Sequence, residues 1–308
     1  MPSKPPIHPY IGIIIGLPAV SAASLIIHAA LQAGAPPLGV AAYRLVFASL
    51  ALAPLAWARY RPELLRLSRR DWLLAAGAGL FLGLHFGTWI TSLQYTAIAS
   101  SVVLVSISPL FVGLFSWLLW RERFGRALLG GLALTTIGAA LVGLADACAL
   151  TGGNLVCPPV AQFVRGRAFV GDLLALAGAA AFAGYLLLGR ALRAKLSLVA
   201  YIFIGYSAAA ITLLLTVFAR RIPLFGYSPT AYFWIVVLAV VPQLIGHSAF
   251  NWALRYLSAT YVAVTILGEP IGSTVLAFIL LQQVPAPLKL LGGAFILIGI
   301  LLASRQRQ

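Results

Sequence analysis

The 308 residues of this chain are 62% hydrophobic, and only 9% of them are charged. A water-soluble domain carries about 25% charged residues, so this composition excludes a soluble globule and predicts an integral membrane protein. The net charge of +15 is divided among short clusters between apolar runs, which excludes the continuous basic face of a nucleic-acid-binding protein.

Ten apolar segments are long enough to cross a bilayer, which takes about 20 residues. They lack the period-two alternation of a membrane barrel, so we predict helices and an all-α fold. The first run has no clear signal-peptide cleavage site, and we interpret it as a spanning helix. The predicted spans are residues 10–31, 37–57, 72–93, 96–118, 126–145, 171–192, 198–219, 231–254, 258–281 and 287–303.

Basic residues are distributed unevenly between the two sides of these spans. Fifteen of the 21 lysines and arginines flank the side that holds both termini, five flank the other side, and Arg44 lies inside a span. By the positive-inside rule, both termini are predicted to be cytoplasmic.

Arg44 lies at membrane depth in the second predicted span, about 10 Å from its outer end at about 1.5 Å rise per residue. Its guanidinium could hold a substrate carboxylate through two parallel hydrogen bonds. Alternatively, its long side chain could reach the interface or pair with Glu269.

The third span carries His85 and Trp89, which are one helical turn apart. A histidine in a cavity can donate or accept hydrogen bonds and titrates near neutral pH. The alternatives are a packed histidine and an interfacial tryptophan. In the fourth span, Pro109 interrupts the backbone hydrogen bonds and is a candidate hinge.

The longest predicted loop, residues 146–170, lies outside the membrane and contains Cys148 and Cys157. An oxidising exterior favours a disulfide between them, and the alternative is two unpaired thiols. With no histidine nearby, a zinc site is not expected, and no metal or other cofactor is predicted.

The eighth span carries His247, followed four and five residues later by Asn251 and Trp252. Aromatic walls and one amide would suit a flat apolar side chain with a polar end. Core packing is the alternative for Trp252.

Glu269 lies about 11 residues into the ninth span, or about 16 Å, and therefore near the bilayer centre. A carboxylate at that depth must be neutralised, paired or exposed to water, and such residues mark transport pathways. Glu269 is thus a candidate proton or ammonium site, and a structural partner of Arg44 or a histidine is the alternative. The adjacent Pro270 is a second candidate hinge.

The two halves of the chain repeat one pattern at a fixed spacing. Pro109 and Pro270 are 161 positions apart, as are two pairs of glycines, and His85 and His247 are 162 apart. Because each half holds five spans, the second copy enters the membrane from the opposite side, which makes an inverted repeat. The predicted organisation is a first repeat at 1–145, the loop 146–170 and a second repeat at 171–308. The glycine pairs are Gly131 with Gly292 and Gly138 with Gly299.

Several motifs in both halves resemble the drug/metabolite transporter superfamily in its ten-helix, EamA-like form. One departure is Gln282-Gln283, where many relatives have an acidic residue. The motifs are Leu93-Gln94-Tyr95-Thr96-Ala97, Ile107-Ser108-Pro109-Leu110, Trp120-Arg121-Glu122-Arg123-Phe124, Gly130-Gly131, Leu257-Ser258-Ala259-Thr260, Gly268-Glu269-Pro270 and Leu291-Gly292-Gly293.

The resemblance is greatest to amino-acid exporters of the YddG type. It implies a multi-pass protein of the bacterial inner membrane that exports aromatic and other neutral amino acids by alternating access. A proton-coupled exporter of drugs or other metabolites is the alternative. The expected partners are a small-molecule substrate and the lipid bilayer. The oligomeric state stays open, since one copy is sufficient to form the pathway.

Other functional classes lack their motifs. The histidines and acids have neither metal-binding spacing nor a serine partner in a glycine-rich turn, which argues against an intramembrane enzyme. Rings of like charge and carbonyl-filter motifs, typical of channels, are missing from the sequence. No phosphate-binding loop of an ATPase is present, so this chain by itself is not predicted to be driven by ATP.

Overall fold

The computed structural model describes residues 8–120, 126–147, 149–151, 154–156, 166–257, 262, 265–266 and 268–304. Its elements are α1 (Pro9–Ser21), α2 (Ala23–Gln32), α3 (Pro37–Leu65), α4 (Arg69–Ser92), α5 (Ile98–Val105), α6 (Ser108–Trp120), α7 (Arg126–Ala147), β1 (Ala149–Thr151), β2 (Asn154–Val156), α9 (Arg167–Arg193), α10 (Leu198–Ala219), α11 (Pro229–Leu238), η1 (Ala239–His247), α12 (Ser248–Ala253), α14 (Gly268–Leu281) and α15 (Pro287–Ser304).

The described chain is helical apart from its connections and one small hairpin. Strands β1 and β2 pair antiparallel, with Thr151 opposite Asn154, inside the predicted loop 146–170. The all-α prediction is confirmed for the fold, and this short hairpin lies in the connection between α7 and α9.

Seven helical stretches of the described residues are long and apolar enough to cross a membrane. Three shorter apolar helices accompany them, at Leu129–Val142, Gly268–Leu281 and Pro287–Gly299. The protein is therefore a multi-pass helical membrane protein. The predicted count of ten spans stays a prediction.

Serine hydroxyls cap the N-termini of several helices. Each accepts a hydrogen bond from a backbone N–H of the first turn, which satisfies a donor that the helix itself cannot pair. The capped helices are α4, through Ser68 and the N–H of Asp71 at 3.1 Å; α10, through Ser197 and Ala200 at 3.3 Å; and α11, through Ser228 and Ala231 at 3.2 Å.

Three of the predicted continuous spans are interrupted. The first bends at Ala22, four residues after Pro18, between α1 and α2. The fourth breaks after Ser106 and restarts as α6, with Pro109 in its first turn. The eighth widens into the π-helix η1, which contains Pro242. Each proline lacks an N–H, so the regular hydrogen-bond ladder of the helix is incomplete at these points.

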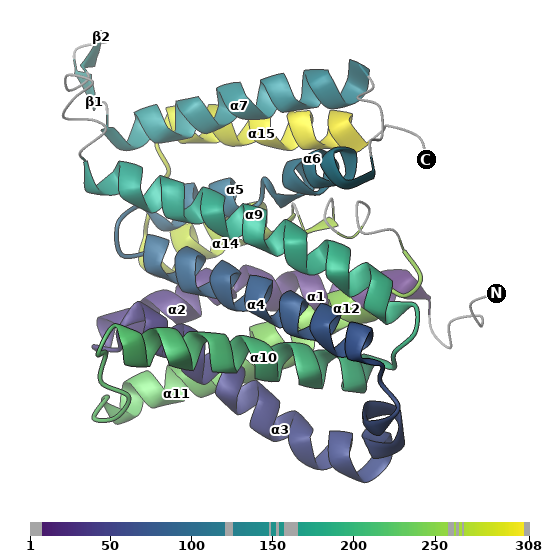
Figure 1. Cartoon of the computed structure of the whole chain (residues 1–308). Coiled ribbons are helices and arrows are strands. Elements are labelled where there is room, and N and C mark those ends of the chain that lie inside the picture. The colour runs from purple at the N-terminus through teal and green to yellow at the C-terminus, as the bar shows by residue number, and fades with distance from the viewer. Residues whose placement is uncertain are drawn as a thin grey trace.

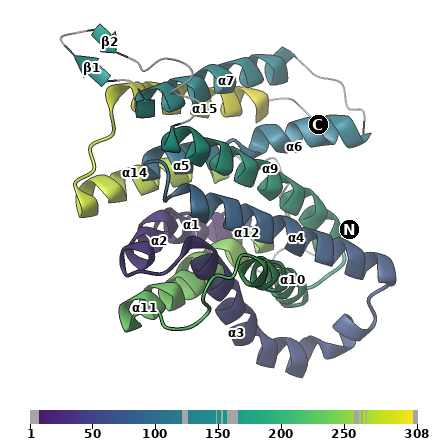
Figure 2. The same cartoon turned by 60° about the vertical axis from the view of Figure 1, so that its left-hand side comes forward.

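The packing pairs elements from the two halves of the chain. Helix α3 packs on α10, α4 on α9, α7 on α15, and α1 on η1 and α12. In Figures 1 and 2, α7 and α15 lie side by side at one edge of the molecule, and α3 lies toward the opposite edge. The buried core fills the space between these pairs and surrounds the helix interruptions.

Glycines allow α7 and α15 to approach closely. A Cβ atom on Gly138 would lie 2.6 Å from the carbonyl oxygen of Gly292, and one on Gly292 would lie 2.7 Å from the carbonyl oxygen of Gly138. A Cβ on Gly299 would likewise lie 2.7 Å from the carbonyl oxygen of Gly131. Small residues at these positions are needed for this backbone contact.

Candidate functional site

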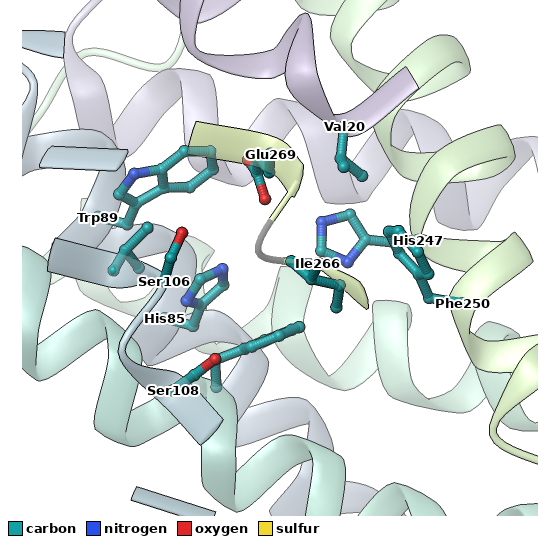
Figure 3. Close-up of a pocket in the computed structure, with 11 residues that line it drawn as sticks. Val20, His85, Trp89, Ser106, Ser108, His247, Phe250, Ile266 and Glu269 are labelled. Atoms are coloured by element: carbon teal, nitrogen blue, oxygen red, sulfur yellow. The ribbon is translucent and has the colours of Figure 1, made fainter. Parts of the chain in front are cut away.

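The helix interruptions surround a small pocket of about 20 Å³ in the core. Ser106 and Ser108 come from the break between α5 and α6, Val20 lies next to the bend at Ala22, and Glu269 begins α14. Figure 3 shows the side chains that line the pocket, which are Val20, His85, Trp89, Val105, Ser106, Ser108, Phe182, His247, Phe250, Ile266 and Glu269.

Glu269 supplies the acidic group of the pocket. Its side chain is buried, and its carboxylate points into the space between His85 and His247 in Figure 3. Among the described residues, no Lys, Arg or His nitrogen lies within 4 Å of this carboxylate. A buried carboxylate without a cationic partner attracts a proton or a positively charged group of a ligand.

His85 is held by a hydrogen bond to the backbone of α9. Its Nδ1 lies 3.0 Å from the carbonyl oxygen of Gly178 on α9. A carbonyl only accepts hydrogen bonds, so Nδ1 donates, and Nε2 of the neutral ring remains as an acceptor. Gly178 allows this contact, because a Cβ there would lie 3.3 Å from the Cβ of Trp89 and 3.4 Å from the carbonyl oxygen of His85.

Aromatic rings join the two histidines. The Phe182 ring lies 4.7 Å from His85 and 6.0 Å from His247, measured between centroids. Phe86 lies 4.7 Å from His85 and 5.3 Å from His247, and Trp89 stacks on His85 at 5.7 Å. Of these rings, Trp89 and Phe182 line the pocket, where a flat apolar group can pack on them.

Arg44 lies outside the pocket lining, in a neighbouring buried layer. Its Nε donates to Oε1 of Gln243 at 2.7 Å, and its guanidinium lies 4.0 Å from the centroid of the Phe86 ring. The side chain is 0% exposed, so it does not reach the interface. No ion pair joins it to Glu269 within 4 Å in the described part of the chain.

Asn251 and Trp252 also lie outside the pocket lining. The Asn251 amide accepts from the hydroxyl of Tyr185 at 2.9 Å and donates to that of Tyr206 at 3.4 Å. Trp252 packs against Gly12 of α1 and against Tyr256. Both residues follow His247 along the chain, but the turn of the helix points them to other neighbours.

The remaining predicted residues occupy other places. Pro109 and Pro270 lie in the first turns of α6 and α14, where a missing N–H costs little, rather than within continuous helices. Cys148 and Cys157 lie outside the described residues. Within the described ranges, no three His, Cys, Asp or Glu side chains come together as a metal site would require.

Sequence reasoning missed the apolar part of the lining, including Val20, Phe182 and Phe250. An apolar side chain in an apolar span carries no signal of its own. The prolines that mark the interruptions could have directed attention to Val20 and to Ser106, because both lie within three residues of a proline.

The sequence model of the EamA-like transporter family matches residues 9–144 and residues 169–305 of the chain. The chain is 27% identical over 277 residues to the inner membrane protein YtfF of Escherichia coli K12, which covers 82% of each chain. It is 24% identical over 276 residues to an uncharacterised transporter of Archaeoglobus fulgidus, which covers 88% of this chain and 89% of the other.

Two further matches are a relative aligned over a shorter stretch and a solved structure. A protein described as a probable terminal-alkyne amino-acid exporter, from Streptantibioticus cattleyicolor, is 27% identical over 205 residues, which is 66% of this chain and 63% of that protein. A solved crystal structure matches with a TM-score of 0.65 at 19% identity, covering 97% of this chain and 99% of that one. At this identity the structural likeness concerns the fold alone.

Proposed function

Because this chain belongs to the EamA-like transporter family, we propose that it exports small metabolites, in particular aromatic and other neutral amino acids, across the bacterial inner membrane. The observation that carries this proposal is the pocket itself. It combines a carboxylate that has no ion-pair partner within 4 Å among the described residues with aromatic rings in the lining.

The pocket has groups for two parts of such a substrate. The Glu269 carboxylate would hold the ammonium group by a charge-assisted hydrogen bond. Trp89, Phe182 and Phe250 would pack against the side chain, and such contacts accept many apolar groups. The amino-acid exporter of Streptantibioticus cattleyicolor gives independent support for this class of substrate.

The transport step we propose is alternating access between two inverted repeats, with both termini in the cytoplasm and Pro109 and Pro270 at the hinges. The pairing of α3 with α10 and of α7 with α15 supports it, because each pair exchanges its members when the two family-matched halves are swapped. The helix interruptions around the pocket also support it, because such transporters usually bind their substrate where helices are interrupted.

Reconstituted liposomes test this function directly. We expect the purified protein to move labelled phenylalanine and other neutral amino acids, and a pH gradient to change the rate if protons are exchanged. Empty liposomes and an excess of unlabelled substrate are the controls. If no amino acid moves, the function as an amino-acid exporter is excluded, and the apolar wall of the pocket would favour drugs or other apolar metabolites.

A further inference from the structure

Arg44 and Gln243 form a buried cluster in which three donor nitrogens have no acceptor in the described part of the chain. The Arg44 Nε–H is used by the Oε1 atom of Gln243 at 2.7 Å. The other two guanidinium nitrogens, Nη1 and Nη2, and the amide nitrogen of Gln243 have no hydrogen-bond partner among the described residues. Both side chains are fully buried.

Such an arrangement is costly unless an acceptor arrives. Each buried donor without a partner loses its hydrogen bonds to water, and a buried guanidinium also loses most of its solvation. The Arg44 guanidinium lies 4.0 Å from the centroid of the Phe86 ring. This cation–π contact stabilises the charge, but the ring does not replace an oxygen acceptor for the N–H groups.

Arg193 shows how the protein satisfies a buried arginine that has only a structural role. Its side chain is 1% exposed. Its Nε donates to the carbonyl oxygen of Asn251 at 2.9 Å, and its Nη1 donates to that of Leu196. The fold supplies carbonyl oxygens to Arg193 and none to Nη1 and Nη2 of Arg44 among the described residues.

The donor cluster adjoins the pocket. Gln243 and His247 are both in η1, four positions apart, which is close to one helical turn. Phe86 contacts Arg44 on one side and has its ring 5.3 Å from that of His247 on the other. This span begins at Pro229, which is its outer end in the proposed orientation. Gln243 is therefore closer to the outer side than His247.

We propose that Arg44 and Gln243 bind a small anionic group, and that during export this group is the carboxylate of the amino acid as it leaves the pocket. A guanidinium and an amide can share the two oxygens of a carboxylate between them. The assignment of the anion to the substrate rests on the proposed function, whereas the anion site itself does not.

Binding of three related compounds to the purified full-length protein tests this proposal. Phenylalanine has both charged groups, phenethylamine lacks the carboxylate, and 3-phenylpropionate lacks the ammonium. For the wild-type protein we expect phenylalanine to bind more tightly than phenethylamine by on the order of tenfold to a hundredfold, the range for hydrogen bonds to a charged group.

Arg44→Lys and its matched control Arg193→Lys separate the two arginines. The lysine at position 44 loses the forked donor, so the preference for phenylalanine over phenethylamine should fall while phenethylamine itself binds as before. Arg193→Lys should keep the wild-type preference. If Arg44→Lys does not fold, Gln243→Leu removes the amide from the same cluster, and it should also weaken the preference.

Chloride distinguishes a free anion from a substrate group. If neither amine nor amino acid binds, the proposed function fails, but a rise of melting temperature with chloride in the wild type and not in Gln243→Leu would still support the anion site. If phenylalanine and phenethylamine bind equally and chloride has no effect, the anion site is overturned, although amino-acid export would stand.

Discussion

Two acidic residues of α4 and α14 differ sharply in their surroundings. Asp71 lies in the first turn of α4 and pairs with Lys195 at 3.0 Å, whereas Glu269 is buried and faces the pocket. In the proposed function, only Glu269 meets the substrate. In the proposed function, the ammonium group and a proton compete for Glu269, so substrate should bind more weakly in the wild type as the pH falls.

Glu269→Gln keeps the size of the side chain and removes its charge. We expect phenylalanine to bind on the order of tenfold to a hundredfold more weakly, with an affinity that no longer changes with pH. Isothermal titration across pH 5 to 8 measures both effects. Asp71→Asn is the control and should behave like the wild type. A Glu269→Gln variant with wild-type affinity and pH dependence would remove Glu269 from the site.

The carbonyl oxygen of Gly178 holds the His85 ring in place through the hydrogen bond to Nδ1. A Cβ on Gly178 would lie 3.1 Å from Oγ1 of Thr88 and 3.3 Å from the Cβ of Trp89, so with alanine these groups of α4 must give way by a few tenths of an ångström. We expect Gly178→Ala to lower the free energy of unfolding by about 1–3 kcal/mol and to reduce substrate binding.

The control is Gly205→Ala on α10, where a Cβ would meet nothing within 4 Å. Alanine is the better helix former, so this variant should be neutral or more stable by up to about 1 kcal/mol. Thermal unfolding in detergent compares the two. Equal effects at both glycines would show that helix propensity, and not the contact with His85, decides the outcome.

At the scale of elements, the sequence predicts where helices cross the membrane better than where they break. Hydropathy identifies the spans because it averages over about 20 residues, but the same average hides a change of hydrogen bonding at two or three of them. Prolines alone do not solve this problem. Pro109 and Pro242 coincide with interruptions, yet Pro54 and Pro62 lie within the continuous helix α3.

The candidate site could likewise be predicted only in part. His85, His247 and Glu269 stand out in apolar spans and do line the pocket. Arg44 and Asn251 stand out equally but point elsewhere, because depth along a helix does not determine which neighbour a side chain faces. The apolar part of the lining becomes visible only when the helices are packed together.

The π-helical segment η1 gives a test at this scale. Pro242 cannot donate a backbone hydrogen bond, which favours the wide turns that aim both Gln243 and His247 inward. Pro242→Ala restores the N–H and should allow a regular helix that turns one of these side chains away. We therefore expect a several-fold loss of export without loss of thermal stability.

Pro54→Ala in α3 is the matched control, since Pro54 is also inside a helix but lies outside the pocket lining. It should transport like the wild type. Liposome flux and melting temperature, measured for both variants, separate an effect on transport from an effect on stability. Unchanged flux in Pro242→Ala would mean that the π-helix has no part in transport.

For the whole molecule, the contact between α7 and α15 reflects the repeat that spans the chain. The sequence spacing relates Gly131 to Gly292 and Gly138 to Gly299. The observed close approaches join Gly138 to Gly292 and Gly131 to Gly299. In the proposed inverted repeat, a two-fold axis would convert the first of these contacts into the second, as in an isologous interface, so both would arise from one duplicated feature.

This relation predicts how substitutions combine. A Cβ at Gly138 or at Gly292 would collide with the same stretch of facing backbone, at 2.6 Å and 2.7 Å from the nearest carbonyl oxygen. Gly138→Ala and Gly292→Ala should each cost about 1–3 kcal/mol. The double variant should cost clearly less than the sum of the two single costs, because the first methyl group already separates the helices and neighbouring sites are not additive.

Gly293→Ala is the control, since its Cβ would meet only Val103 at 3.9 Å, and it should be neutral. Chemical unfolding of the four variants measures these costs, and strict additivity of Gly138→Ala and Gly292→Ala would show that the two glycines do not share one contact.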